Sequence, residues 1–506
     1  MPRFHSDPGS IDQTLHVLCR DIGNRLAGTE NEHRTAEYVA DRMREIGLPE
    51  VTVERFPFRV WGYEAAEVRV TGDGARSIDA IPVANSPATP EEGLEAEVVY
   101  VDNATPADLA MHDVDGKILL VWGLYGDTPE KLHALNECGA VGVLWVDDRL
   151  PFDWPVAAGT PYDWRDILQI PQLTLPYFDA LELAKQSGVR VRMISRTWSE
   201  PAESVNVFGD LPGAGEELVH VGAHIDSVIV GVGAEDDGSG VAAMLEAARM
   251  MVELGERPER TIRFCAFGAE EQLSEGARQY VQAHPDEADR TRLMVQLDSV
   301  AAVTGRNQLR VVGPPELTDA VRALIQPGHE PLHEPLSEAA GTPAEGEDRG
   351  SYTRGGDTHR PEEAGPGARH GPSPGTPARD RASIARGAEM ARPSEAGPSP
   401  QLQPRGMPVI SGEVLEEVSP YSDMFPFNAR GAPSVWLHRM NQAGTRYFHH
   451  SHLDDLQSIS AEVIAMHANA TAHLAHTAAF TDPTWQRTIP EAQMSEINEM
   501  AARFFL

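Results

Sequence analysis

The sequence contains few cysteines. Of its 506 residues only Cys19, Cys138 and Cys265 are cysteines, and they are widely spaced without a CxxC pair. An odd number of isolated cysteines indicates neither a disulfide framework nor a thiolate zinc site. We therefore expect the protein to occupy a reducing compartment.

Long hydrophobic runs are also lacking. No stretch reaches the roughly 18 apolar residues that would indicate a membrane-spanning helix, and the N-terminal stretch MPRFHSDPGSIDQTL has no apolar segment of signal-peptide length. Together with the cysteine pattern, these absences predict a cytoplasmic protein with no membrane partner.

Positive charge is scarce. Lys and Arg together number 42 against 77 Asp and Glu, which gives a formal net charge of -35. A polyanion would be repelled by such a chain instead of binding with release of counterions. We therefore exclude nucleic acid and anionic membranes as partners.

The length and the changes in composition indicate several domains. Apolar residues recur at helical spacing near the N-terminus, and short strands follow. We expect an N-terminal part of a catalytic domain (1–86), an inserted β-rich domain (87–196), the main catalytic domain (197–332), a low-complexity insertion (333–406), and the C-terminal part of the catalytic domain with a terminal helix (407–506).

Two of these segments are defined by their composition. In 87–196 the stretches AEVVYV, GKILLVWG, VGVLWV and IPQLTL read as strands, with one helix in TPEKLHALNECGA. The segment 333–406 consists mainly of Pro, Gly, Ala, Arg, Glu and Ser. Such a composition buries too little apolar surface to offset the entropy of ordering, so we predict a disordered insertion.

Strands and helices alternate in the catalytic segments. ELVHVGAH, RTIRFCAFG, RLMVQLD and APSVWLH read as buried strands, whereas GVAAMLEAARMMVEL and EGARQYVQAH have helical periodicity. This alternation predicts a three-layer α/β domain with a mixed sheet buried on both faces.

Potential metal ligands follow the predicted strands. Because ligands bind at the carboxyl ends of strands in open α/β sheets, we expect these groups to converge. Each also has a purely structural interpretation, as a polar residue with its hydrogen bonds made within the protein or as part of a pair of acidic residues on the hydrated surface. The residues are His224 and Asp226, Glu270 and Glu271, Asp298, and His449 and His450.

The stretch VGAEDDGSG (232–240) places three acidic residues side by side between glycines. Their repulsion can be offset by water around an exposed turn or by a bound cation. Asp236 would enter the site from the start of a helix that Asp237 or Ser239 could cap. Nitrogen and oxygen donors without thiolates suit zinc, manganese or cobalt, and two close cations need a bridging carboxylate.

Several stretches in order resemble metallopeptidase family 28, the di-zinc aminopeptidases and their carboxypeptidase and dipeptidase relatives. They are HIDSVIVGVGAEDDGSG, GAEEQLSEGARQYV, QLDSV, YSDMFPFNARGAPSVWL and FHHSHLDD. The resemblance covers about 204–476 apart from the insertion, and IGNRLAGTENEHRTAEYVADRM is similar to the family's N-terminal helices. The segment 87–196 resembles a protease-associated domain, and FHHSH and LGERPERTIRF resemble the carboxypeptidase Q branch.

The resemblance implies a role for each candidate. It implies two Zn²⁺ ions as cofactors, with Co²⁺ or Mn²⁺ as alternatives. Glu270 would be the general base that moves a proton from the attacking water to the leaving amine, and Asp226 would hold the second ring nitrogen of a ligand histidine. One ion would be bound by His224, Asp236 and Asp298 and the other by Asp236, Glu271 and His450, so that Asp236 is the bridge.

His450 is preferred to His449 and His452 as the ligand because the family's motif places an aspartate four residues later, matched by Asp454. Several relatives have a tyrosine directly before the ligand, where this chain has His449.

The predicted function is an exopeptidase acting on peptide substrates, with an aminopeptidase preferred. A dipeptidase or carboxypeptidase is the close alternative and would need an arginine near the pocket, for which Arg430 and Arg439 are candidates. A non-catalytic peptide-binding relative and a single-metal cyclase are further alternatives. Phe425 and Phe427 could line the substrate pocket or belong to the core, and a homodimer is left open.

Overall fold

The computed structural model describes residues 2–72, 74–124, 128–325, 409–440 and 448–505. Within these residues the helices are α1 (Pro8–His16), α2 (Glu30–Ile46), α3 (Pro106–Ala110), α4 (Pro129–Glu137), α5 (Tyr177–Ala184), α6 (Ser239–Glu253), α7 (Glu275–Ala283), α8 (Pro285–Asp289), α9 (Pro315–Arg322), α10 (Met424–Ala429), α11 (Ala461–Phe480) and α12 (Glu491–Phe504). The strands are β1 (Glu50–Val70), β2 (Arg76–Asp79), β3 (Ile81–Pro82), β4 (Leu94–Tyr100), β5 (Ile118–Trp122), β6 (Gly142–Val146), β7 (Gln172–Leu175), β8 (Arg190–Leu211), β9 (Leu218–His224), β10 (Thr261–Phe267), β11 (Thr291–Leu297), β12 (Arg306–Val312), β13 (Glu413–Glu416) and β14 (Ser434–Met440).

The strands form one mixed sheet in the order β13-β12-β14-β11-β9-β10-β8-β4-β5-β6-β7-β3, with β1 paired to β8 and β2. In its centre β9 pairs in parallel with β10 and β11, and β11 pairs in parallel with β14. Every residue of β9 and of β11 is buried. A strand that is buried on both faces needs a continuous run of apolar residues instead of alternating polar and apolar residues. The sequences of β9 and β11 contain such runs.

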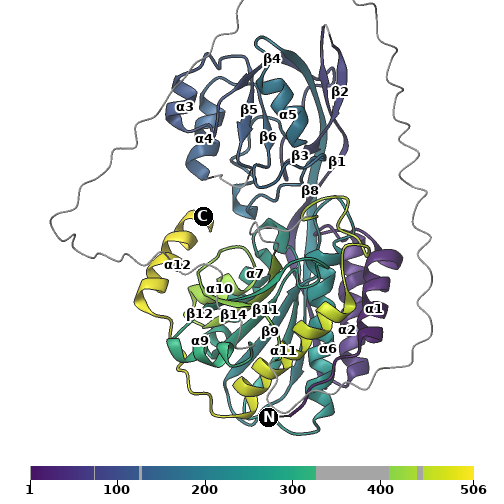
Figure 1. The fold of residues 1–506 in the computed structure, drawn as a ribbon, viewed down its shortest axis with the longest axis vertical. Coiled ribbons are helices and arrows are strands. Elements are labelled where there is room, and N and C mark those ends of the chain that lie inside the picture. Colours follow the sequence, from purple (N-terminus) through teal and green to yellow (C-terminus); the bar gives the residue numbers. More distant parts are fainter. Residues whose placement is uncertain (1, 73, 125–127, 326–408, 441–447, 506) are drawn as a thin grey trace, which may run out of the picture. The chain divides into compact units, whose positions relative to one another are not determined.

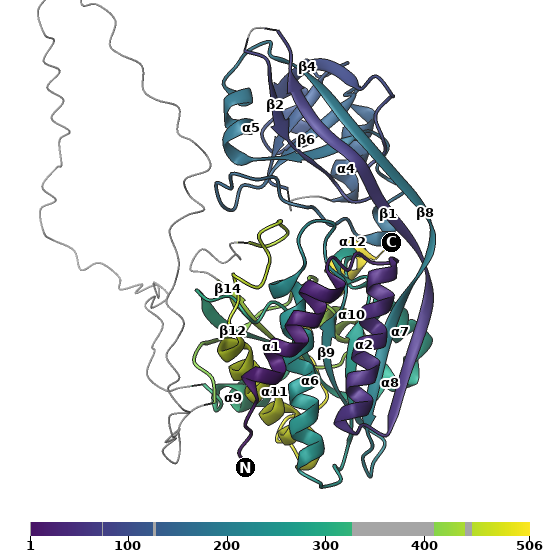
Figure 2. The same cartoon turned by 90° about the vertical axis from the view of Figure 1, so that its right-hand side faces the viewer.

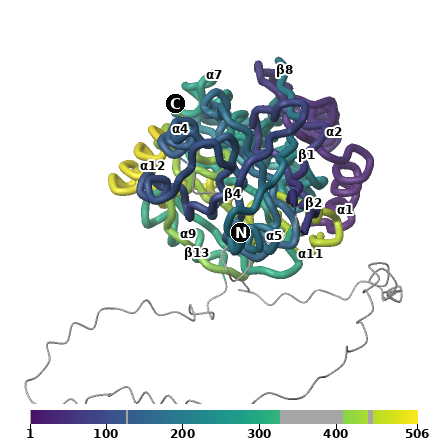
Figure 3. The backbone as a smooth tube through the Cα atoms, turned by 90° about the horizontal axis from the view of Figure 1, so that it is seen from above, coloured from purple at the N-terminus to yellow at the C-terminus, as the bar shows by residue number. Residues whose placement is uncertain are grey.

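Helices cover both faces of this central sheet (Figures 1 and 2). On one face α1, α2, α6 and α11 pack together, and their apolar side chains form one cluster with Val219, Val221 and Val295 of the strands. On the other face Tyr280 of α7 and Phe427 of α10 form a separate cluster. The tube view shows α1 and α2 side by side (Figure 3). The predicted α/β fold with a mixed sheet is therefore confirmed.

The two longest strands connect the central sheet with the segment 87–196. Strand β8 pairs with β10 near its carboxyl end, at 207–211, and with β4 near its start, at 190–193. Strand β1 runs antiparallel to it over nearly its full length. Beyond β4, the strands β5, β6 and β7 continue in parallel and enclose two apolar clusters of their own.

Most of the catalytic elements that were expected from the sequence are confirmed. The helices α6, α7 and α12 and the strands β9, β10, β11 and β14 agree with the predicted stretches within a few residues. Helix α11, which packs against α6, was not expected. Near the N-terminus, where short strands were expected, the chain instead forms the single long strand β1, followed by the short strands β2 and β3.

The predicted insertion at 333–406 lies outside the described residues. The chain on either side of the gap is joined by hydrogen bonds, because Val409 N and Ile410 N both donate to Leu324 O, at 2.9 and 3.2 Å. Among the described helices, none is long and apolar enough to cross a bilayer.

Candidate metal centre

Three of the predicted site segments follow neighbouring strands. His224 is the last residue of β9, Glu270 and Glu271 form a short turn after β10, and Asp298 directly follows β11. Since these strands are parallel, their carboxyl ends lie at the same edge of the sheet. The turn after β10 is bounded by residues with left-handed backbone, Ala269 at φ 55° and Leu273 at φ 65°, a conformation that the surrounding structure must hold in place.

Asp236 lies between the histidines of the site. Its Oδ1 is 3.1 Å from His224 Nε2, whereas its Oδ2 is 3.6 Å from His450 Nε2 and 3.5 Å from His449 Nε2. The side chain is 7% exposed. The two carboxylate oxygens thus face different imidazoles, as a bridging ligand requires.

The two glutamates after β10 face different histidines. Glu271 Oε2 is 3.0 Å from His450 Nε2, and Glu270 Oε2 is 3.9 Å from His224 Nε2. The side chain of Glu271 is 7% exposed and that of Glu270 is 12% exposed.

Two groups of three residues bring their donor atoms within 4.8 Å of one another. They are His224 with Asp236 and Glu271, and Asp236 with His449 and His450. Among the described residues Asp298 belongs to neither group. Its Oδ2 accepts a hydrogen bond from Ser422 Oγ at 2.7 Å, and the residue is buried.

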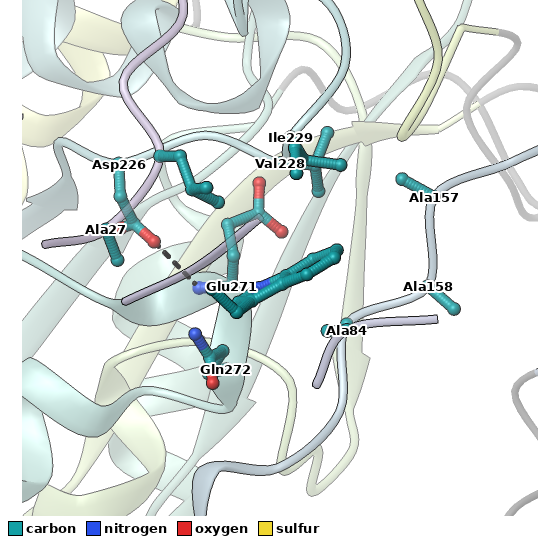
Figure 4. Close-up of a pocket in the computed structure, with 12 residues that line it drawn as sticks. Ala27, Ala84, Ala157, Ala158, Asp226, Val228, Ile229, Glu271 and Gln272 are labelled. Carbon is teal, nitrogen blue, oxygen red and sulfur yellow. Dashed lines mark hydrogen bonds between the residues drawn. The ribbon is translucent and has the colours of Figure 1, made fainter. Parts of the chain in front are cut away.

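Asp226 links the first histidine to the turn of the glutamates. Its Oδ1 lies 3.4 Å from His224 Nδ1 and accepts from Glu270 N at 2.9 Å, while its Oδ2 accepts from Glu271 N at 3.2 Å. Figure 4 shows the latter bond. The carboxylate is fully buried. It therefore holds the imidazole and both glutamates in one arrangement.

Asp237 organises the backbone behind the site. It is fully buried, and its carboxylate accepts hydrogen bonds from His224 N (3.2 Å), Gly240 N (2.9 Å) and Ser299 N (3.1 Å). The N-cap residue of α6 is Gly238 instead of the expected Asp237 or Ser239, and Asp237 contacts the first turn through its bond to Gly240. A Cβ at Gly240 would lie 2.3 Å from Asp237 Oδ2, so glycine is needed there for the carboxylate to approach.

Asp454 fixes the loop that carries Asp236. Its Oδ1 and Oδ2 accept from Glu235 N at 2.7 Å and from Asp236 N at 3.1 Å. Burial raises the pKa of this carboxyl group to about 7. The peptide bond between Asp236 and Asp237 is cis.

Arg25 is a site residue that the sequence did not single out. It is fully buried, and its guanidinium donates to Ile225 O (2.8 Å), Val232 O (2.5 Å) and Gly233 O (2.9 Å). It therefore holds the loop between β9 and Asp236 by its carbonyl groups. In the sequence, Arg25 lies within the stretch IGNRLAGTENE, which was interpreted only as part of the N-terminal helices.

Buried carboxylates dominate the electrostatics. Burial raises the pKa of Glu270 well above its usual value; His224 opposes this shift, and Asp423, Asp298 and Glu271 add to it. Burial alone lowers the pKa of His224, but the neighbouring carboxylates of Asp226 and Asp236 raise it above the usual value. Asp423, also unexpected, is fully buried, and burial raises its pKa as well.

The residues fit a divalent metal ion. Several carboxylates are buried at one edge of a sheet with imidazole nitrogens between them, and repulsion among them needs a nearby positive charge. The donors are carboxylate oxygens and imidazole nitrogens without thiolates, the set that suits zinc and related ions. Of the two readings of the acidic loop, the buried arrangement excludes the exposed, hydrated turn.

A small pocket with a largely apolar lining, partly open to solvent, adjoins Glu271 (Figure 4). Its apolar lining includes Trp61, Ala157, Ala158, Val228 and Ile229. The inserted segment thus supplies part of its wall.

Other candidates from the sequence lie elsewhere. Phe425 and Phe427 are fully buried in apolar clusters, so they belong to the core. Arg430 precedes β14, at the end of the sheet opposite the site, and pairs with Asp289 at 2.8 Å. Arg439 lies near the carboxyl end of β14 and donates to Ala302 O at 2.6 Å.

The profile of peptidase family M28 matches residues 206–356. Carboxypeptidase Q of Bos taurus is 26% identical over 336 residues, which cover 62% of this chain and 70% of that protein. The probable lipoprotein aminopeptidase LpqL of Mycobacterium tuberculosis is 30% identical over 269 residues, with 52% and 51% covered. Aminopeptidase YwaD of Bacillus subtilis is 29% identical over 292 residues, with 57% and 60% covered.

Solved structures share the fold. The M28 peptidase precursor of Shewanella amazonensis superposes with a TM-score of 0.69 at 20% identity, covering 95% of both chains. BSAP, a zinc aminopeptidase from Bacillus subtilis, gives a TM-score of 0.64 at 20% identity, covering 96% of this chain and 98% of that one. These structures thus share the fold, and the match of residues 206–356 to the peptidase family M28 model agrees with the resemblance stated above.

Proposed function

We propose that this protein is a zinc-dependent aminopeptidase that removes residues from the N-terminus of peptides, with two metal ions at the site. The observation that carries the proposal is the position of Asp236, whose two oxygens face His224 and His450 separately. A carboxylate in this position can bridge two cations. The zinc aminopeptidase of Bacillus subtilis with the same fold supports the choice of metal.

The proposed ligand sets are those that the family resemblance implies, and the geometry supports Asp236 as their shared member. His224, Asp236 and Asp298 would hold one ion, and Asp236, Glu271 and His450 the other. Glu271 lies within reach of both histidines, which favours a compact pair of ions. Bound zinc would supply Lewis acidity for the peptide carbonyl and for the attacking water.

The chain's own residues would handle the proton. Glu270, with its carboxylate 3.9 Å from His224 Nε2, would accept a proton from the water and donate it to the leaving amine. Asp226 would keep this glutamate in place through its backbone amide. The small pocket beside Glu271 would receive an uncharged side chain of the substrate.

The surplus of buried carboxylates favours a substrate with a free amino group. Arg430, which could have read a free carboxylate, is paired with Asp289 at the opposite end of the sheet. A carboxypeptidase or dipeptidase remains the second candidate because carboxypeptidase Q is similar over 70% of its length.

The deciding experiment compares peptides with free and blocked ends. Zinc-loaded protein should hydrolyse leucine p-nitroanilide and C-amidated dipeptides, and N-acetylated dipeptides should not be cleaved. Cleavage of N-acetylated dipeptides with a free carboxylate would instead show a carboxypeptidase. Tight peptide binding without turnover would show a non-catalytic relative.

Two further assignments belong to this proposal. The segment 87–196, with its parallel strands β4 to β7 and its own apolar clusters, is proposed to be a protease-associated domain. A cytoplasmic location is proposed with it, and fractionation of cells that produce the protein would test this location.

A further inference from the structure

Two neighbouring histidines compete for the same position at the metal centre. The rings of His449 and His450 are stacked with centroids 3.6 Å apart. Their Nε2 atoms lie 3.5 and 3.6 Å from the same atom, Asp236 Oδ2. Distance to the bridging carboxylate therefore does not distinguish a metal ligand from a neighbour.

The second ring nitrogen of His450 faces an acceptor. His450 Nδ1 is 3.0 Å from Ala157 O, and Ala157 N donates to His450 O at 2.8 Å. A carbonyl oxygen only accepts, so Nδ1 must carry the hydrogen. In a neutral imidazole Nε2 then has the lone pair, which is the form that binds a metal.

The second ring nitrogen of His449 faces a donor instead. His449 Nδ1 is 3.3 Å from Arg149 Nη2. A guanidinium only donates, so Nδ1 must accept and Nε2 must carry the hydrogen. The opposite tautomer would place two N–H groups against each other at this distance.

Arg149 is itself held firmly. Its Nε is 3.0 Å from Asp147 Oδ1 and its Nη2 is 2.6 Å from Asp147 Oδ2, in a forked pair whose carboxylate is 3% exposed. Arg149 N also donates to Asp147 Oδ1 at 3.0 Å. Asp147 directly follows strand β6, Arg149 lies in the same loop, and Ala157 lies further along the same segment. One segment, 87–196, therefore contacts both histidines from outside the catalytic sheet.

We propose that this segment sets opposite tautomers on the two histidines. Ala157 O makes His450 the ligand, and the Asp147–Arg149 pair makes His449 an N–H donor at the metal centre. Resting on the proposed function, His449 Nε2–H would donate to the peptide carbonyl oxygen, where negative charge develops during hydrolysis. Asp147 and Arg149 are positioning residues, which act through His449.

The first test is independent of activity. In zinc-loaded protein with ¹⁵N-labelled histidine, NMR should show His449 protonated at Nε2 and His450 at Nδ1, assigned from the signals lost in H449Q and H450Q. The zinc content of H449Q should equal that of the parent protein, whereas H450Q should lose zinc. Loss of zinc from H449Q, or protonation of His449 at Nδ1, would overturn the proposal.

The second test uses the positioning pair. R149M, which keeps the apolar stem and removes the donors, should keep its zinc while kcat falls about tenfold or more with a smaller change in KM. H449L should lose about 100-fold in kcat, in the range for removal of one oxyanion donor. H449Q, whose amide can still donate, should recover part of that loss.

R192M is the matched control, because Arg192 belongs to the same segment but pairs with Glu95 on the surface. It should leave kcat unchanged. An unchanged kcat in both R149M and H449L would overturn the donor role. If the parent protein cleaves no peptide, the proposed function fails, while the NMR and zinc measurements still decide the tautomers.

Discussion

At the scale of single residues, the site is built from carboxylates with distinct tasks. The two carboxylate oxygens of Asp236 face His224 and His450. The adjacent Asp237 accepts hydrogen bonds from three backbone amides, and burial raises its pKa. Asp454 holds the amides of Glu235 and Asp236 from the far end of the chain. The difference arises from where the backbone directs each carboxylate, because the residue types are alike.

The roles of Glu270 and Asp236 can be separated by mutation. E270A should keep its metal because Glu270 is not a proposed ligand, but turnover should fall by roughly 10²- to 10⁴-fold, as for loss of a general base. D236A should lose metal as well as turnover because both ions depend on the bridge. Metal content by plasma mass spectrometry and kcat on leucine p-nitroanilide measure the two effects.

E316A provides the control for these variants, since Glu316 is exposed at the start of α9. Its metal content and turnover should match those of the parent protein. Hydrolysis that is unchanged in E270A would contradict the proposed proton transfer.

At the scale of elements, α12 connects the two apolar regions of the chain. Ile497 packs with Val312 and Phe425 of the catalytic domain, while Phe504 stacks on Trp164 of the inserted segment at 5.7 Å. The sequence predicted this helix, but its apolar spacing did not reveal which surfaces it joins.

Removal of the Phe504 ring should therefore destabilise the protein. The residue is 7% exposed within an apolar cluster, and F504A should cost about 3 kcal/mol of unfolding free energy from lost burial and a cavity. Urea denaturation followed by tryptophan fluorescence measures this change.

F178A is the comparison, because Phe178 is 51% exposed on α5. It should change stability by less than about 0.5 kcal/mol. Equal stabilities of F504A and F178A would show that the stacked contact with Trp164 contributes nothing.

At the scale of the whole molecule, we expect the predicted insertion to be separable from the site. No proposed ligand lies in 333–406, and the chain on either side meets where Val409 N donates to Leu324 O. Loop-closure entropy changes only slowly with length. Replacing 333–406 by a short Gly-Ser linker should leave zinc content and kcat/KM within about twofold of the parent values.

In the matched control, the same linker is inserted into an exposed loop of the otherwise unchanged chain. This control shows whether the linker itself alters zinc content or kcat/KM. Loss of zinc or of expression in the deletion variant alone would show that the segment contributes to the catalytic domain.

Most of the catalytic sheet and its candidate ligands could be predicted from the sequence. Apolar runs of strand length specified β9, β10, β11 and β14, and polar residues directly after them marked the edge where a site forms. His224 and Glu271 were singled out in this way, because a strand end fixes the position of the next few side chains, whereas Asp236 was singled out from the acidic stretch before α6.

The sequence could not predict contacts between segments that are distant along the chain. Arg149 and His449 are 300 residues apart, and Arg25 reaches a loop about 200 residues away. Such pairs depend on how the inserted segment and the N-terminal turn pack against the sheet edge, and no local pattern encodes that packing.

The sequence by itself determined the fold class, the stretches that form the strands next to the candidate ligands, and the chemistry of those ligands. These follow from local hydrophobic pattern and residue type. Only the tertiary structure decided which carboxylate faces two histidines and which partners His449 and His450 have. A histidine's tautomer is set by the atom opposite its second nitrogen, and at both histidines that atom belongs to another part of the chain.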